Sequence, residues 1–469
     1  MSKASYLLKN TGILAIGSFS SKILTFLLVP LYTAVLTTEE YGAYDIILST
    51  CTLLTPVLTL NIADAMLRFP LEKDADIPRI ARMGIGVTLA SGLIVLAGQF
   101  MPGAPWRSLS GIGFVVPLYL SSALYQLLVL LARGLERFKD VAVAGVLSSV
   151  VIVCLNVILL SFLGCGLEGF FVANIVGMLL PAVFLLLRMR LVVFGPPVAS
   201  ARDHELLIKM VRYSVPLGMT VVGWWMITTS GRYIVLAFCG LEANGLYSVA
   251  NRIPAIMTTV ASIFMQAWQV SVIKDFDSSD QDGFLLGVFD RVEMLLVLFC
   301  AILIPATPLI SSMLFQGEFY AAWKYVPFLL IYAVINAMSG MWGPFFAASY
   351  DTRPMAMSTA LGGIVNVALG VVLVALFGVQ GAALASLFAG LTNWAWRGIK
   401  VRKHVGINFH MRKSLATYGV LCAQGIVMIS DLPIGICVSI ESLLLAGLFF
   451  YYRQGLRICI SAALERAKK

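Results

Sequence analysis

The sequence has few charged residues for its length. Asp, Glu, Lys and Arg make up 12% of its 469 residues, about half the share of roughly 25% that is typical of soluble domains. It contains no Walker A motif, no HExxH motif, no GxSxG motif in a strand–helix context, and no acidic metal cluster. Its eight cysteines form no CxxC pair. These absences argue against ATP hydrolysis and against metal or redox chemistry, so no cofactor is expected.

Long apolar runs are abundant instead. The hydrophobic share is 59% and the mean hydropathy is +0.91. Apolar runs of about 20 residues recur along the chain, each long enough to cross a hydrocarbon core of about 30 Å. The sequence therefore predicts an all-α polytopic membrane protein with about 14 transmembrane helices. The spans lie near 11–36, 42–67, 80–100, 109–132, 141–163, 168–187, 213–238, 244–272, 284–310, 325–349, 355–377, 380–396, 414–430 and 433–452.

The basic residues support this set of spans. With the N-terminus inside, nearly all of the 33 Lys and Arg residues fall in cytoplasmic segments, and Arg107 and Lys324 fall outside. A missed span would invert every later loop and spoil this asymmetry. Because cytoplasmic loops collect Lys and Arg, we expect both termini in the cytoplasm and the chain in the inner (plasma) membrane. The net charge of +9 thus reflects topology, and no nucleic-acid partner is expected.

Two pairs of segments indicate an internal repeat. TTEEYGAYDIILSTCTLLTPVLTL (37–60) resembles GLEANGLYSVANRIPAIMTTVASI (240–263), which matches Gly42 with Gly245. GCGLEGFFVAN (164–174) resembles FGVQGAALAS (377–386) at nearly the same shift. We therefore expect two pseudo-symmetric six-helix lobes around a central cavity, related by an axis along the membrane normal. The predicted domains are an N-terminal lobe (1–190), a cytoplasmic linker (191–205), a C-terminal lobe (206–403), an additional helix pair (404–453) and a basic tail (454–469).

Three basic residues fall inside the predicted spans, namely Lys22, Arg232 and Arg252. Each costs about 2.5–3.5 kcal/mol at the centre of a bilayer-spanning helix. We therefore expect them to face a wet cleft between the lobes, where positive charge attracts an anion. Phosphate or pyrophosphate fits best, because guanidinium offers forked donors to it. Arg232 has an alternative, which is to snorkel to the outer interface.

Three acidic residues also fall in or at the ends of apolar runs. Asp45 and Asp64 are candidates for ion coupling or gating. In the alternative interpretations, Asp45 pairs with a cation that holds the lobes shut, and Asp64 pairs with Arg68 at the inner face. Glu441 lies in the last helix pair, where the sequence offers it no evident partner.

Several stretches resemble one known family. They are LTTEEYGAYDI, NGLYSVANRI, AAWKYVPFLLIYAVINAM (321–338) and GGIVNVALGVVLVALFGVQGAALAS (362–386). Together they resemble the polysaccharide-transporter family, the oligosaccharide flippases, within the superfamily that includes multidrug antiporters and lipid II flippases.

The resemblance implies a function. A member of this family would move a polyprenyl-pyrophosphate-linked oligosaccharide from the inner to the outer leaflet by alternating access, for surface polysaccharide biosynthesis. Lys22, Arg232 and Arg252 would then engage the pyrophosphate or acidic sugars. The implied partners are this glycolipid, the lipid bilayer and other polysaccharide-assembly proteins.

Three other functions stay open. A cation-coupled multidrug or small-molecule exporter of the same superfamily predicts an acid-dominated cavity and about twelve spans. A membrane-embedded glycan polymerase or ligase predicts a large outer loop with catalytic residues, whereas the outer loops here are short. A non-transporting assembly scaffold would keep full glycan export after Arg252→Ala or Lys22→Ala.

Overall fold

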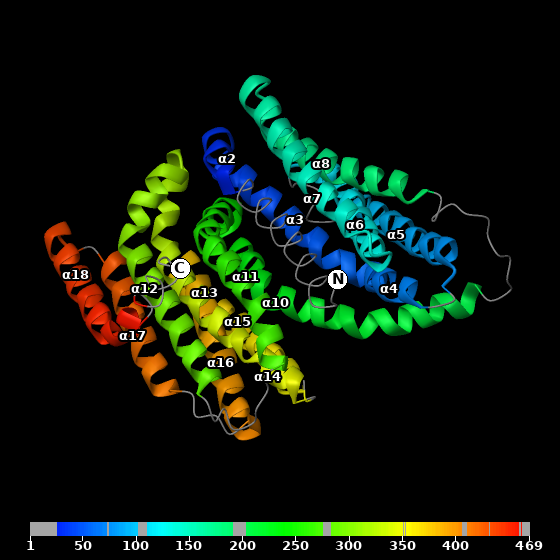
Figure 1. The fold of residues 1–469 in the computed structure, drawn as a ribbon. Helices are drawn as coiled ribbons and strands as arrows, with labels where there is room; N and C mark the ends of the chain where they lie inside the picture. Colours follow the sequence, from blue (N-terminus) through cyan, green and yellow to red (C-terminus); the bar gives the residue numbers. More distant parts are fainter. Residues whose placement is uncertain are drawn as a thin grey trace. The chain divides into compact units, whose positions relative to one another are not determined.

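The computed structural model describes residues 26–72, 75–101, 110–190, 203–274, 283–349, 351, 353–405, 410–430, 432–458 and 461. Contacts group the chain into two compact units (Figure 1). The first unit is Met1–Trp225 with Leu241–Gly245, and the second is Met226–Gly240 with Leu246–Lys469. Lys22, most of the predicted linker and much of the predicted tail lie outside the described residues.

All regular secondary structure among the described residues is helical, which confirms the predicted all-α fold class. A helix satisfies its backbone hydrogen bonds internally, as hydrocarbon surroundings require. Ten helical stretches among these residues are long and apolar enough to cross a membrane. The predicted span 11–36 lies largely outside the described residues. The predicted span 213–238 and most of the predicted span 244–272 fall within one stretch, His204–Ser262. The count of fourteen stays a prediction.

The first unit is built around α6. This helix packs against α8, α4 and α5, and α7 packs against α8 (Figure 1). Its core is a cluster of buried aliphatic side chains that includes Met66, Leu127 and Leu131. The helices of this unit are α2 (Val29–Val35), α3 (Thr38–Leu58), α4 (Ile62–Arg68), α5 (Ile77–Gln99), α6 (Val115–Gly134), α7 (Phe138–Asn156) and α8 (Gly166–Arg188).

The start of α3 is fixed by a local sequence signal. Thr37 accepts a hydrogen bond from the Glu40 backbone N–H (3.1 Å), and the Glu40 carboxylate accepts one from the Thr37 N–H (2.9 Å). This reciprocal pair is a capping box, which satisfies two otherwise unpaired donors.

A break inside the predicted span 42–67 separates α3 from α4. The predicted span 42–67 is two helices, because Leu60 and Asn61 have left-handed backbones with φ of 52° and 54°. Pro56 weakens the end of α3 because it donates no backbone N–H. Asn tolerates the left-handed region better than most residues do, and the Asn61 carbonyl accepts from the Asp64 N–H in the first turn of α4.

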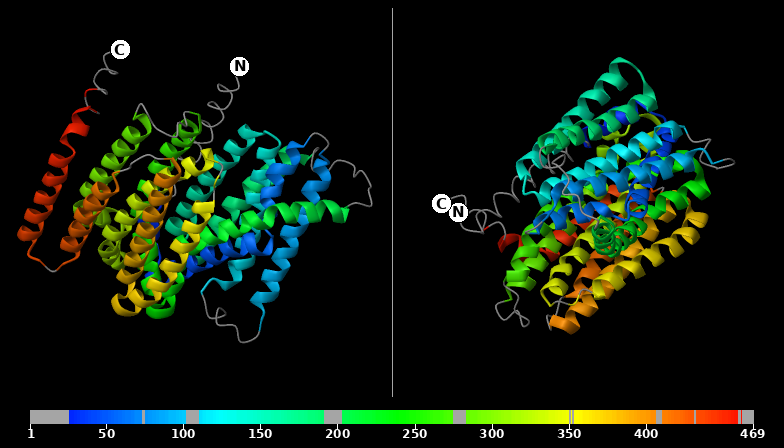
Figure 2. Two further views of the ribbon diagram at one scale, coloured as in Figure 1. Left: turned by 90° about the horizontal axis from the view of Figure 1, so that it is seen from below. Right: turned by 90° about the vertical axis from the view of Figure 1, so that its right-hand side faces the viewer.

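The second unit centres on α13 and α16. The helix α16 packs along α15 and α13, and Figure 2 shows α15 and α16 side by side. Trp342 stacks with Phe289 and lies 5.6 Å from Trp394 between ring centres. The helices of this unit are α11 (Arg252–Lys274), α12 (Phe284–Leu314), α13 (Val326–Met341), α14 (Gly343–Ala348), α15 (Arg353–Phe377), α16 (Val379–Val405), α17 (Met411–Ile429) and α18 (Ile434–Tyr451).

One long helical stretch, α10 (Asp203–Ala250), contributes to both units. Its only non-helical backbone is at Gly240, with φ of 85°, inside the predicted outer loop. Glycine adopts such a φ without a steric penalty. Trp225 donates to the Ser49 carbonyl (3.0 Å), which joins the first part of α10 to α3. Contacts thus place residues 203–225 in the first unit. The predicted internal repeat instead puts the boundary between the two lobes at 191–205. The domains based on the repeat stay a prediction.

Candidate functional site

The two predicted acidic site residues lie in the first unit. Asp45, in α3, is buried with 3% of its surface exposed. Asp64, in α4, is half-buried and accepts a hydrogen bond from the Asn61 amide (2.6 Å). Arg68 forms its salt bridge with Glu72 (3.7 Å), and both of those side chains are about half exposed. The helix break therefore sets Asp64 beside Asn61, a partner that neither of the interpretations from the sequence includes.

The predicted cationic residues Arg232 and Arg252 lie in the second unit. Arg232 is within α10 and Arg252 is the first residue of α11, and both are half-buried. Both also have interactions with other parts of the chain. The third predicted cation, Lys22, lies outside the described residues.

A buried amide fixes the backbone that carries Arg232. Asn366, on α15, is 2% exposed and donates to the Ile227 carbonyl (2.9 Å) and to the Ser230 hydroxyl (3.1 Å). These bonds hold α10 against α15 one turn before Arg232. Asn366 belongs to GGIVNVALG, one of the stretches that resemble the polysaccharide-transporter family. In this structure that residue makes the contact between α10 and α15.

A buried guanidinium lies in the second unit, directly after the predicted span 380–396. Arg397 lies within α16 and is 2% exposed. It donates to the hydroxyls of Ser358 (2.8 Å) and Thr359 (3.0 Å) and to the Ser339 carbonyl (3.2 Å). Among the described residues, no acid forms a salt bridge with Arg397. The charge of Arg397 is therefore stabilised by hydroxyl and carbonyl dipoles. These partners are distant in the sequence, so no local pattern predicts the contacts.

A buried carboxylate ties α12 to α17. Glu293 accepts from the Ser414 hydroxyl (2.9 Å) and from the Tyr418 hydroxyl (2.8 Å). One turn earlier on α12, Asp290 lies 3.5 Å from His410 at the start of α17. The additional helix pair is thus anchored to the second unit by polar contacts as well as by apolar packing.

In the first unit the two glycines that the repeat matched lie against each other. A Cβ built on Gly42 would overlap the Leu241 carbonyl and would lie 3.0 Å from the Gly245 nitrogen, and one on Gly245 would overlap the Thr38 carbonyl. The Asn244 amide donates to the Gly42 carbonyl (3.1 Å). Only a residue without a side chain permits such a backbone crossing.

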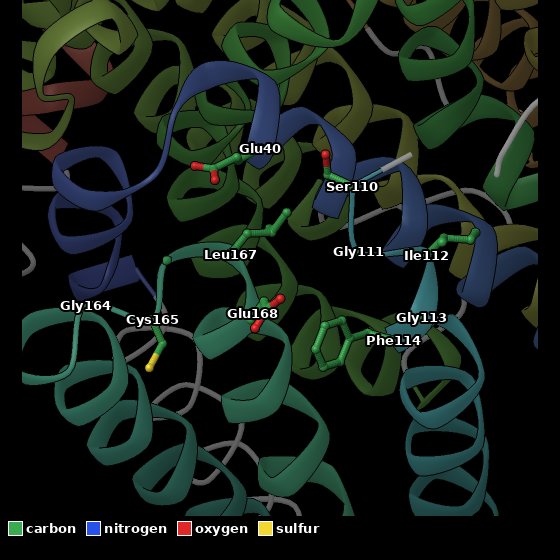
Figure 3. Close-up of a pocket in the computed structure, with 11 residues that line it drawn as sticks. Glu40, Ser110, Gly111, Ile112, Gly113, Phe114, Gly164, Cys165, Leu167 and Glu168 are labelled. Atoms are coloured by element: carbon green, nitrogen blue, oxygen red, sulfur yellow. The ribbon is translucent and has the colours of Figure 1, made fainter. Parts of the chain in front are cut away.

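A pocket of about 540 Å³ lies at the ends of helices in the first unit (Figure 3). Two carboxylates, Glu40 and Glu168, line it together with Phe114 and glycine-rich turns. Gly111 and Gly166 in those turns have positive φ. Carboxylates attract cations and hydroxyl donors and repel phosphate. The negative charge that lines this pocket therefore does not suit the binding of an anionic group.

Comparison with known structures identifies the fold. A structure described as the lipid II flippase MurJ in an inward closed conformation matches with a TM-score of 0.69 at 14% identity, over 94% of this chain and 99% of that one. An inward-facing multidrug resistance MATE family transporter of the MOP superfamily matches with a TM-score of 0.63 at 15% identity, over 84% and 99%. A MOP superfamily transporter from Pyrococcus furiosus, described by the reverse polarity of its binding pocket, matches with a TM-score of 0.57 at 14% identity, over 85% and 97%.

Sequence comparison identifies the family. No curated protein matches the chain. A family model described as polysaccharide biosynthesis protein matches residues 7–269, which is more than half of the sequence. The chain therefore belongs to the polysaccharide biosynthesis protein family, and it has the membrane transporter fold that MurJ and the MATE transporters share.

Proposed function

We propose that the protein is a flippase that moves a polyprenyl-pyrophosphate-linked oligosaccharide from the inner to the outer leaflet. The glycolipid would serve the biosynthesis of a surface polysaccharide such as O-antigen, capsule or exopolysaccharide. The match of residues 7–269 to the polysaccharide biosynthesis family carries this proposal. The likeness in fold to a lipid II flippase supports it.

The basic residues within the predicted spans favour an anionic substrate that carries a pyrophosphate. Arg232 and Arg252 lie in α10 and α11 of the second unit, and the bonds of Asn366 hold the backbone that precedes Arg232. In the proposal these two guanidinium groups, together with Lys22, bind the pyrophosphate. Forked donors bind phosphate oxygens two at a time and so fix its orientation.

The direction of transport follows from the membrane potential. The cytoplasm is normally the negative side, so moving an anion outward is favourable by about 2.3 kcal/mol per charge per 100 mV. Asp45 and Asp64, both in the first unit, are the proposed ion-coupling or gating groups. The proposed topology has both termini in the cytoplasm and the chain in the inner membrane, and two six-helix lobes would alternate in access.

The proposal is tested in cells that lack the protein. The lipid-linked glycan should accumulate on the inner leaflet, and the wild-type chain should restore its export. A chain with both Arg232→Ala and Arg252→Ala should restore less than a tenth of that export, because loss of two charge-assisted contacts costs about 3 kcal/mol or more. The matched control is Arg212→Ala, an exposed arginine of the same helix α10, which should restore full export.

Two results would contradict the proposal. Glycan that already sits on the outer leaflet in deleted cells would exclude flipping by this chain. Full export by the double variant would exclude Arg232 and Arg252 as the anion site. A change in drug susceptibility without any change in glycan export would favour the multidrug exporter instead.

A further inference from the structure

Glu441 is buried in a helix that is otherwise mostly exposed. It is the one charged residue of α18, whose apolar stretch has only 11% of its residues buried. Glu441 itself is 4% exposed. The helix packs on α17 and α12 within the second unit (Figure 1), and Glu441 lies near its middle. A carboxyl group at this depth is costly in its charged form.

The partner of Glu441 is an amide from the neighbouring helix. Gln424, on α17, is fully buried, and its Nε2 donates to Glu441 Oε2 (2.9 Å) and to the Ala301 carbonyl of α12 (3.3 Å). Both amide hydrogens are thereby used. Glu441 Oε1 and Gln424 Oε1 are also buried, and neither has a hydrogen-bond partner among the described residues. Two acceptors therefore remain, and the pair has no donor left for either of them.

No cation among the described residues compensates a charge on Glu441. The basic residues of α17 are Arg412 and Lys413, and Lys413 precedes Gln424 by eleven residues, about 16 Å along a helix. The charged residues of α12 lie in its first three turns, and α13, which packs on both helices, has none. The titratable groups closest in sequence to the three contacting residues are thiols, Cys437 on α18, Cys422 on α17 and Cys300 on α12.

We propose that Glu441 and Gln424 form a proton-binding site. One proton on Glu441 Oε1 converts that acceptor into a donor, and Gln424 Oε1 is the acceptor it lacks. The result is a reciprocal carboxylic acid–amide pair that satisfies both remaining acceptors at once. In the ionised form two buried oxygen acceptors and an uncompensated charge would remain, each of which is expensive away from water.

The site would connect proton binding to helix packing. Gln424 contacts α18 through Glu441 and α12 through Ala301, so the bound proton completes a link across three helices. Loss of the proton would place a charge between α17 and α18 and weaken their contact. This inference goes beyond the proposed function and does not depend on it.

Infrared spectroscopy of the purified full chain in lipid bilayers tests the protonation state. The spectrum of wild type minus Glu441→Gln at neutral pH should contain the carbonyl stretch of a carboxylic acid. Glutamine can make the same two reciprocal bonds with Gln424, so this variant should fold. The control is Glu39→Gln, an exposed carboxylate, whose difference spectrum should contain carboxylate bands. Carboxylate bands in the Glu441 spectrum would overturn the proposal.

A second measurement needs no variant. Apolar carbodiimides react with protonated carboxyl groups that lie within membranes, adding the acid across a C=N bond and giving a stable N-acylurea. Peptide mapping of the wild-type protein should find this adduct on Glu441, with at least a tenfold slower rate at pH 10 than at pH 6. An unmodified Glu441, or a rate independent of pH, would overturn the proposal.

Discussion

Gly42 and Gly245, which the predicted internal repeat matches with each other, lie against each other in the first unit. A Cβ on Gly42 would lie 3.0 Å from the Gly245 nitrogen, and the neighbouring Asn244 amide donates to the Gly42 carbonyl (3.1 Å). The crossing joins the first turns of α3 to the segment Leu241–Gly245, which the contacts assign to the first unit.

We expect Gly245→Ala to destabilise the protein. Its methyl group would overlap the Thr38 carbonyl, so the two backbones must separate. Overpacking of this kind typically costs about 1–3 kcal/mol. The measurement is thermal unfolding of the purified protein by size-exclusion fluorescence. Gly86→Ala is the matched control, because a Cβ there meets nothing within 4 Å, and it should leave the unfolding temperature unchanged or raise it. Equal stability of the two variants would refute the close crossing.

Asn61 should tolerate glycine better than alanine. Its left-handed backbone (φ 54°) separates α3 from α4, and such a conformation costs about 1–2 kcal/mol for a residue with an ordinary side chain. Both substitutions remove the hydrogen bond to Asp64, so their difference isolates the backbone contribution. Unfolding temperatures of the two variants measure it. A more stable Asn61→Ala would show that the segment is continuous helix.

Asn366→Leu should impair both stability and export. The substitution removes the bonds to the Ile227 carbonyl and the Ser230 hydroxyl and leaves that hydroxyl without its donor. A loss of about 1–3 kcal/mol is expected for a buried polar group left unsatisfied. Because the bonds hold α10 one turn before Arg232, glycan export per folded molecule should also fall. Export that falls only in proportion to protein abundance would show that Asn366 does not position Arg232.

Arg397→Met should destabilise the second unit. The guanidinium makes three hydrogen bonds across α13, α15 and α16, and hydrogen bonds to charged groups contribute about 1.5–3 kcal/mol each before the cost of burying the charge is subtracted. Arg402→Met, an exposed arginine on the same helix, is the control and should change stability by less than about 0.5 kcal/mol. Similar unfolding temperatures for both variants would contradict the arrangement around Arg397.

The helices were predictable because each depends on its own composition. Apolar runs of bilayer length located them, and the Thr37–Glu40 capping box and the Gly240 break fall at predicted span ends. The break at Leu60 and Asn61 was missed because the predicted span 42–67 continues through LTLNIADA. An Asn in the left-handed region has no local marker that distinguishes it from a helical one. Local sequence rules therefore locate the helices more reliably than the turns between them.

The polar pairs within the second unit were not predictable. Arg397 finds Ser339 and Ser358 at separations of 58 and 39 residues, and Glu441 finds Gln424 on a different helix. The distribution of charges along the sequence indicates that these residues are present. It does not indicate which residues of other helices contact them. The candidate cations Arg232 and Arg252 were identified because a basic residue in an apolar run is itself unusual, and their assignment to an anion stays a prediction.

Flipping by the purified protein in proteoliposomes tests the proposed flippase function directly. A polyprenyl-pyrophosphate-linked oligosaccharide is placed in one leaflet, and a membrane-impermeant glycosidase reports the glycan that reaches the other. Wild-type protein should expose the glycan at least tenfold faster than protein-free vesicles do, and faster than protein with both Arg232→Ala and Arg252→Ala. A rate for wild-type protein equal to that of empty vesicles would contradict the claim that this chain is a flippase.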